Sequence, residues 1–210
     1  MDKQFWHDKW QQKKQGFHQN APNEMLVKHL GALALAEDGR VFLPLCGKTN
    51  DIPWLLSKGL HVVGAELSEF AVEQLFEALA IRPEISIIGT VKCFCGPKIQ
   101  IFAGDFFDVS REMLGVVDGI YDRAALVALP KEMRRRYAQH LVDISANATQ
   151  LLVSFVYEQT QMNGPPFSVD GAEIHHLYGQ NYSVTKIDSK PISLGVMSEL
   201  IVREEAWLLE

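Results

Sequence analysis

Cysteine is scarce in this chain of 210 residues, which contains only Cys46, Cys93 and Cys95. Three is an odd number and too few for a disulfide framework, so we expect a protein of the reducing cytoplasm. Cys93 and Cys95 are spaced CxC rather than CxxC, and no histidine lies close enough in sequence to complete a zinc-site spacing. We interpret the pair as strand packing, with weak adventitious metal binding as the alternative, and we expect no metal site.

The sequence also lacks long apolar runs and an excess of basic residues. No stretch approaches the roughly 20 apolar residues of a membrane span, and the first 19 residues mix charges and aromatics without the apolar core of a signal peptide. Twenty basic residues against 26 acidic ones give a net charge of -6, which argues against binding along a phosphate backbone. We therefore expect neither a membrane nor a nucleic acid as a partner.

What the sequence does contain is an ordinary globular composition, with 47% apolar and 22% charged residues. No repeat, low-complexity tract or linker divides it, so we expect one domain over 1–210. Short apolar runs alternate with helix-like segments, which predicts an α/β fold whose parallel strands are joined by right-handed crossovers. The expected strands are 41–45, 60–67, 99–103, 116–121 and 151–157, and the expected helices between them are 50–57, 68–80, 109–114 and 131–146.

Three segments fall outside this alternation. Residues 81–98 contain two short strand-like runs and are interpreted as an inserted hairpin, either an extension of the sheet edge or part of a lid. Residues 1–36 are expected to form an N-terminal helical cap, whose clearer helix spans 23–36. Two strand-like runs at 182–187 and 196–209 are close in sequence, which predicts an antiparallel pair at the end of the sheet.

In an open α/β sheet, ligands bind at the carboxyl ends of the strands, near the point where the strand order reverses. The loop after the first expected strand carries a single glycine, Gly47, so it contains neither the G-x-G-x-x-G fingerprint nor a complete phosphate loop. This argues against a nicotinamide oxidoreductase. A turn with one glycine suits a ligand that has no pyrophosphate but lies against backbone, which makes Gly47 a candidate cofactor contact.

Glu66 ends the second expected strand, about 20 positions beyond Gly47. At this spacing a carboxylate accepts hydrogen bonds from ribose hydroxyls, so Glu66 is a candidate nucleoside ligand. The alternative is that Glu66 stabilises the N-terminus of the next helix, which Ser68 is expected to cap. The residues alone leave both interpretations open.

The loops after the third and fourth expected strands carry charged groups. Asp105 offers a carboxylate, followed by two phenylalanines, where an adenine ring would lie, and Asp108 is interpreted as the cap of the next helix. The fourth strand leads into Asp122 and Arg123, which would face the reacting end of a ligand or else close the sheet edge as an ion pair. The ligand interpretation is stronger for Arg123, because arginine binds carboxylates bidentately.

Together these residues resemble the thiopurine S-methyltransferase family, in the right order over nearly the whole chain. The resemblance rests on Phe5-Trp6 with Trp10, Gly16-Phe17-His18-Gln19, Pro44 to Lys48 with Asp51 and Trp54-Leu55, Val63-Gly64 with Glu66 and Ser68-Glu69, Gly104 to Phe107, Tyr121 to Ala128, and Pro165-Pro166-Phe167. It implies a class I S-adenosylmethionine-dependent methyltransferase fold, which is Rossmann-like. Such a fold has a seven-stranded, mostly parallel sheet with an antiparallel last strand, here with an N-terminal helical cap.

The resemblance also implies an activity: transfer of a methyl group from S-adenosylmethionine to the sulfur of aromatic and heterocyclic thiols such as thiopurines, leaving S-adenosylhomocysteine. Selenium or tellurium compounds and other small thiols are alternative acceptors. A non-catalytic module that binds nucleosides or thiols is an alternative of a different class. No sequence feature calls for a second chain, so we expect a monomer.

The site residues expected from the family resemblance and from the loops are of two kinds. The cofactor contacts are Trp10, Leu45, Gly47, Glu66, Asp105 and Arg123, and the substrate contacts are Phe17, Arg123, Pro166 and Phe167. Because a heterocyclic thiol is already acidic, we expect no single indispensable catalytic residue. Assistance from Asp122 or Arg123, by taking a proton or holding negative charge, is a hypothesis.

Overall fold

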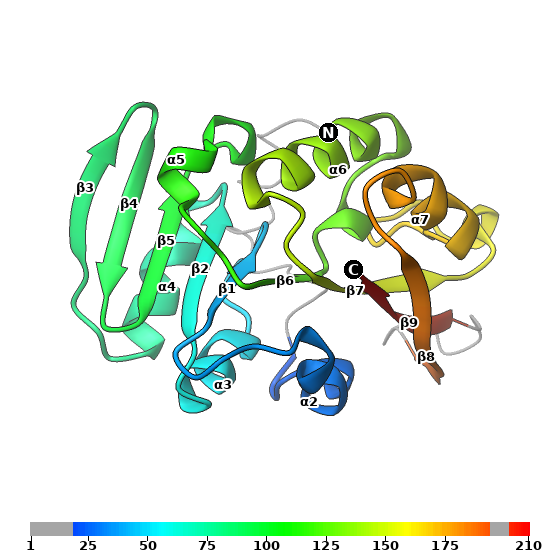
Figure 1. The fold of residues 1–210 in the computed structure, drawn as a ribbon, viewed down its shortest axis with the longest axis horizontal. Coiled ribbons are helices and arrows are strands. Elements are labelled where there is room, and N and C mark those ends of the chain that lie inside the picture. Colours follow the sequence, from blue (N-terminus) through cyan, green and yellow to red (C-terminus); the bar gives the residue numbers. More distant parts are fainter. Residues whose placement is uncertain (1–18, 194–201) are drawn as a thin grey trace.

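A nine-stranded sheet organises this protein in the computed structural model, which describes residues 19–193 and 202–210. Across the sheet the strand order is β3-β4-β5-β2-β1-β6-β7-β9-β8, as Figure 1 shows. The strands are β1 (Arg40–Leu43), β2 (His61–Glu66), β3 (Glu84–Ile88), β4 (Val91–Gly96), β5 (Ile99–Ala103), β6 (Gly119–Arg123), β7 (Gln150–Val156), β8 (Val184–Ile192) and β9 (Val202–Leu209).

The five central strands, β5-β2-β1-β6-β7, pair in parallel, and antiparallel strands flank them on both sides. This confirms the predicted α/β class with an antiparallel last strand, β9, which pairs with both β7 and β8. The expected count of seven strands is wrong. Residues 81–98 contain β3 and β4, which pair antiparallel and join the same sheet through β5, so the sheet has two strands more.

Helices cover both faces of the sheet (Figure 1). On one face lie α2, α3 and α4, and on the other lie α5, α6 and α7. The helices are α2 (Glu24–His29), α3 (Asp51–Ser57), α4 (Glu69–Ala78), α5 (Arg111–Leu114), α6 (Lys131–Ser145) and α7 (Gly171–Tyr178), and short 3-10 turns are η1 (Leu30–Leu33), η2 (Phe106–Asp108), η3 (Leu126–Ala128) and η4 (Gln159–Gln161). Ser68 caps α4 as predicted, because its side chain accepts a hydrogen bond from the Ala71 amide.

Several helix boundaries differ from the prediction, and two of these differences have a clear local cause. The helix expected over 23–36 ends as an α-helix at His29 and tightens into η1, after which Ala34 takes a left-handed conformation with φ 48°. The helix expected from residue 109 starts at Arg111, and Ser110 caps it by accepting from the Met113 amide. Asp108 is therefore not that cap.

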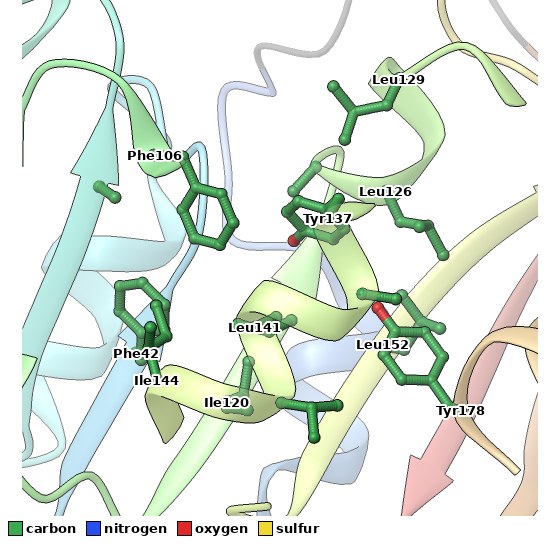
Figure 2. Close-up of a cluster of buried hydrophobic side chains, with 14 of the residues drawn as sticks. Phe42, Phe106, Ile120, Leu126, Leu129, Tyr137, Leu141, Ile144, Leu152 and Tyr178 are labelled. Atoms are coloured by element: carbon green, nitrogen blue, oxygen red, sulfur yellow. The ribbon is translucent and has the colours of Figure 1, made fainter. Parts of the chain in front are cut away.

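Two hydrophobic clusters, one on each face, fix the sheet between its helices. Figure 2 shows part of the cluster under α6, where Phe42 and Ile120 of the sheet meet Leu141 and Ile144 of the helix. Fully burying one such side chain contributes about 1.5–3 kcal/mol. Because β1 and β6 are both packed in this cluster, their carboxyl ends are rigid supports for the loops that follow.

Candidate active site

The candidate site lies where the strand order reverses. β1 pairs with β2 on one side and with β6 on the other, and all three run parallel. Their carboxyl ends therefore lie at one edge of the sheet, which is where open α/β sheets bind ligands. The structure brings five predicted residues to this edge: Leu45 and Gly47 after β1, Glu66 at the end of β2, Asp105 after β5 and Arg123 at the end of β6. Trp10 and Phe17 lie outside the described residues.

Glu66 fixes the turn after β1 through its carboxylate. Its Oε2 accepts a hydrogen bond of 2.8 Å from the Gly47 amide, and its Oε1 accepts one of 2.8 Å from the Ser68 amide. The side chain is buried. These two bonds lock the carboxylate between the β1 turn and the start of α4. The bond from the Ser68 amide supports the interpretation in which Glu66 stabilises the start of the next helix. The ribose interpretation stays a prediction.

The turn itself has an unusual backbone. Leu45 and Gly47 both have positive φ, of 47° and 56°. Such a φ is uncommon for leucine, and residues held this way cluster at functional sites. Between them the Cys46 amide donates to the Ala65 carbonyl of β2 at 2.9 Å, and burial together with the nearby Glu66 raises the pKa of the Cys46 thiol well above its usual range. The turn is therefore anchored on β2 by main-chain and side-chain bonds.

The end of β5 continues this arrangement on the other side of β2. The Gly104 amide donates to the Glu66 carbonyl at 2.9 Å, and the next residue, Asp105, caps η2 by accepting from the Phe107 amide at 3.1 Å. Gly104 has φ 153°, and a Cβ there would lie 2.7 Å from Val91 Cγ1, so glycine is required. Asp105 is thus held one residue away from the β2–β5 contact.

The two phenylalanines after Asp105 have different surroundings. Phe106 is buried in the core, with its ring centroid 5.1 Å from that of Tyr137 (Figure 2). Phe107 is half-buried, and the Arg136 guanidinium lies 3.8 Å from its ring centroid. Of the two predicted aromatic faces, Phe106 therefore packs inward. Asp108, exposed at the end of η2, accepts from the Thr90 hydroxyl at 2.7 Å.

Asp122 and Arg123 belong to β6 itself, because this strand runs over Gly119–Arg123 rather than the predicted 116–121. Consecutive strand residues point to opposite faces. Asp122 is fully buried toward α6, where its Oδ2 accepts from the Tyr137 hydroxyl at 2.7 Å and its Oδ1 from the Leu126 amide at 3.2 Å. Burial raises the pKa of Asp122 to about 6. The structure thus separates the pair, and Arg123 is half-buried on the opposite face.

The predicted substrate loop, after β7, lies against the loop after β6. The Phe167 amide donates to the Val127 carbonyl of η3 at 2.7 Å, and the Tyr157 hydroxyl donates to the Pro166 carbonyl at 2.6 Å. Phe167 also borders an open pocket of about 480 Å³. Other residues lining this pocket are Pro130, Arg134, Gln159, Met162 and Glu173.

Arg134 and Glu173 support this pocket and were not expected from the sequence. Arg134 is only 3% exposed; its Nη1 donates to both Glu173 carboxylate oxygens at 2.8 and 2.9 Å, and its Nε donates to the Leu129 carbonyl. Its guanidinium lies 5.5 Å from the Phe167 ring centroid. In the sequence Arg134 begins a run of three arginines on a helix, which is typical of a solvated surface, so no signal separates it from its neighbours.

A metal centre or a membrane-spanning helix in residues 19–193 and 202–210 would indicate a different kind of protein. No group of three histidine, cysteine, aspartate or glutamate side chains there is placed to hold a metal ion. Cys93 and Cys95 lie side by side on β4 with their sulfurs 3.4 Å apart. Nor does any helix in these residues have the length and apolar character needed to cross a membrane.

Solved structures of other proteins share this fold. A SAM-dependent methyltransferase from Methanosarcina mazei superposes with a TM-score of 0.64 at 14% identity, covering 90% of this chain and 98% of that one. Magnesium protoporphyrin IX methyltransferase from Synechocystis, solved with bound SAH, superposes with a TM-score of 0.58 at 15% identity over 98% of this chain and 95% of that one. The fold is that of the SAM-dependent methyltransferases.

Sequence comparisons identify the family. The family model for thiopurine S-methyltransferase (TPMT) matches residues 1–198. The thiopurine S-methyltransferase of Xanthobacter autotrophicus is 50% identical over 211 residues, covering 100% of this chain and 99% of the relative. That of Gluconobacter oxydans is 43% identical, over 97% of this chain and 92% of the relative. The chain belongs to the thiopurine S-methyltransferase family and is a methyltransferase, which confirms the predicted family and enzyme class.

Proposed function

We propose that this protein transfers the methyl group of S-adenosylmethionine to the sulfur of aromatic or heterocyclic thiols, such as thiopurines, and releases S-adenosylhomocysteine. Membership of the family supports the reaction class. The observation that carries the proposal is the Glu66 carboxylate, which two amides hold in one position at the carboxyl end of β2, beside the turn of Leu45 and Gly47.

The residues at this edge fit S-adenosylmethionine better than a dinucleotide. A fixed carboxylate at the end of the second parallel strand is the usual partner of ribose hydroxyls. The turn after β1 has one glycine rather than three, so it lacks the backbone cradle of a pyrophosphate, which S-adenosylmethionine does not contain. When bound, S-adenosylmethionine supplies an electrophilic methyl carbon. Asp105, Arg123 and Trp10 complete the proposed set of cofactor contacts.

The chain's own contribution to catalysis is proposed to be positioning. Phe17, Arg123, Pro166 and Phe167 would hold the acceptor so that its sulfur lies about 3–3.5 Å from the methyl carbon and in line with the bond that breaks. A thiolate forms readily from a heterocyclic thiol near neutral pH, so no dedicated base is needed. Asp122 is engaged by Tyr137 and Leu126 in the core, which leaves Arg123 as the better candidate to hold negative charge near the sulfur.

A panel assay tests this proposal. The protein is incubated with S-adenosylmethionine and a set of aromatic thiols, aliphatic thiols, and selenium and tellurium oxyanions, and methylated products are identified by mass spectrometry. We expect S-methyl products, with equal amounts of S-adenosylhomocysteine, from the aromatic and heterocyclic thiols. Methylation of the selenium or tellurium compounds alone would contradict the proposed acceptor class. Binding of S-adenosylmethionine without turnover of any acceptor would favour a non-catalytic module.

We further infer a single domain over 1–210 that works as a cytoplasmic monomer, without nucleic acid. The continuous sheet from β3 to β8 supports one domain. Light scattering coupled to gel filtration tests the monomer. If the protein dimerises, the edge strand β3 is the expected contact, because Ile85 and Ile87 are 57% and 75% exposed on it. A dimer that Ile87→Lys dissociates would contradict the monomer and indicate edge-to-edge pairing of two sheets.

A further inference from the structure

Asp51 is a buried carboxylate for which the proposed reaction has no role. It is the first residue of α3 and is 1% exposed. Its Oδ1 accepts a hydrogen bond from the main-chain amide of Asn23 at 2.7 Å. Its Oδ2 accepts from the Thr49 hydroxyl at 3.0 Å and from the Tyr121 hydroxyl at 3.3 Å. Burying a carboxylate is costly unless it is hydrogen-bonded. These three donors come from three separate parts of the chain.

Two of the three donors lie two residues away from residues of the proposed cofactor site. Thr49 ends the turn that contains Gly47, only two residues away. Tyr121 lies two residues before Arg123 on β6, so their side chains share one face of the strand. The pKa of the Tyr121 hydroxyl reflects both neighbours: burial and the Asp51 charge raise it well above its usual range, whereas the Arg123 charge opposes that rise.

The third donor connects Asp51 to the segment before α2. The Asn23 side chain caps α2, while the Asn23 main-chain amide donates to Asp51. The Asn50 side chain, next to Asp51, donates to the Gln19 carbonyl at 2.7 Å, so this short segment is attached to the turn at two points. In the sequence it follows directly on the residues that include Trp10 and Phe17.

We propose that Asp51 is a positioning residue for cofactor binding, which holds the β1 turn, the end of β6 and the segment before α2 in one relative placement. This inference rests on the proposed function. The Glu66 bond to Gly47 fixes the first half of the turn from β2, and Asp51 fixes the second half from α3. With both halves held, the turn meets the nucleoside in a preformed shape, and less binding free energy is lost in ordering it.

The test compares Asp51→Asn with Asp118→Asn. Asp118 also bonds a main-chain amide, that of Arg40, at 2.6 Å, but it lies at the opposite end of β1 and β6. Calorimetric titration measures the Kd for S-adenosylhomocysteine, and initial rates give kcat and KM. For Asp51→Asn we expect Kd and the KM for S-adenosylmethionine to rise about tenfold, with kcat at saturating cofactor nearly unchanged. For Asp118→Asn we expect the wild-type Kd.

If Asp51→Asn does not fold, Thr49→Val and Tyr121→Phe replace it in the test, because each removes one hydrogen-bond donor to Asp51. We expect each of these variants to raise Kd about three-fold. The inference is overturned if folded Asp51→Asn, or both single-donor variants, bind S-adenosylhomocysteine as tightly as the wild type. It is equally overturned if Asp118→Asn weakens binding as much as Asp51→Asn does. Failure of the wild type itself to bind S-adenosylhomocysteine would overturn the proposed function, and this inference with it.

Discussion

Replacing Glu66 by glutamine tests the proposed nucleoside site with the smallest change of shape. The wild-type carboxylate accepts from two main-chain amides, those of Gly47 and Ser68, each at 2.8 Å. Glutamine has one acceptor oxygen, so one buried amide faces an NH2 group instead. Leaving such a donor unsatisfied costs about 1–3 kcal/mol, which sets the expected loss in the free energy of unfolding.

The loss in cofactor affinity has a separate origin. Hydrogen bonds to a charged acceptor contribute about 1.5–3 kcal/mol and those to a neutral one about 0.5–1.5 kcal/mol. Exchanging the carboxylate for an amide should therefore weaken ribose binding by about 1–3 kcal/mol, which raises Kd about 5- to 140-fold. Isothermal titration with S-adenosylhomocysteine measures this change, and urea denaturation measures the change in stability on the same preparations.

Glu69→Gln is the matched control. Glu69 begins α4 three residues further on, its side chain is 42% exposed, and it pairs with Lys92. Its loss removes the same charge from the same region, with an expected effect on Kd below about two-fold, because exposed ion pairs contribute little. A Glu66→Gln protein that is less stable but binds S-adenosylhomocysteine with wild-type affinity would refute the ribose assignment. Equal weakening by Glu69→Gln would assign the effect to general charge.

Three further predictions concern the supports of the site. Because burial raises the folded-state pKa of Asp122 from 3.8 to about 6, its protonated form favours folding, and stability should fall by about 2 kcal/mol as pH rises from 4 to 6. Asp122→Asn should flatten this part of a stability–pH curve from urea denaturation, and an unchanged slope would contradict the burial argument. Glu173→Gln leaves the nearly buried Arg134 without its charged partner and should cost about 2–4 kcal/mol in unfolding free energy; a loss under 0.5 kcal/mol would show that solvent screens this pair. Gly104→Ala places a Cβ 2.7 Å from Val91 Cγ1 at φ 153° and should lower Tm by several degrees in calorimetry. An unchanged Tm would mean that the β3–β4 hairpin shifts to make room for the Cβ at no cost in stability.

Hydrophobic patterning was sufficient to predict the central strands. The prediction for the strand at 99–103 matches its observed boundaries, because a glycine follows it and three of its residues, Ile99, Ile101 and Phe102, are β-branched or aromatic. The fourth strand begins three residues and ends two residues later than predicted. Val116 looks like a strand residue but is 81% exposed, and the ladder instead continues through Asp122 and Arg123, paired with β7. A buried aspartate can stay in a strand because Tyr137, 15 residues away, satisfies it.

Residues of the candidate site that follow from a loop position or a fixed spacing could be predicted from the sequence. Gly47 and Glu66 follow from the loop position and a spacing rule, and the structure joins them by a hydrogen bond. The bonds of Asp51 follow from no such rule, since its partners Asn23 and Tyr121 are 28 and 70 residues away. Periodicity identifies which elements exist, but it does not report which side chains meet once the elements pack.

The position of β9 between β7 and β8 has a consequence for how the protein is made. Among the described strands β8 is hydrogen-bonded to β9 alone, and Glu210 closes that pair by exchanging main-chain bonds with Ser183. During synthesis β8 leaves the ribosome before its partner exists, so this edge of the sheet is completed only after translation of β9. Until then the edge of β7 is open, and a nascent chain stalled before residue 202 would present it to other strands.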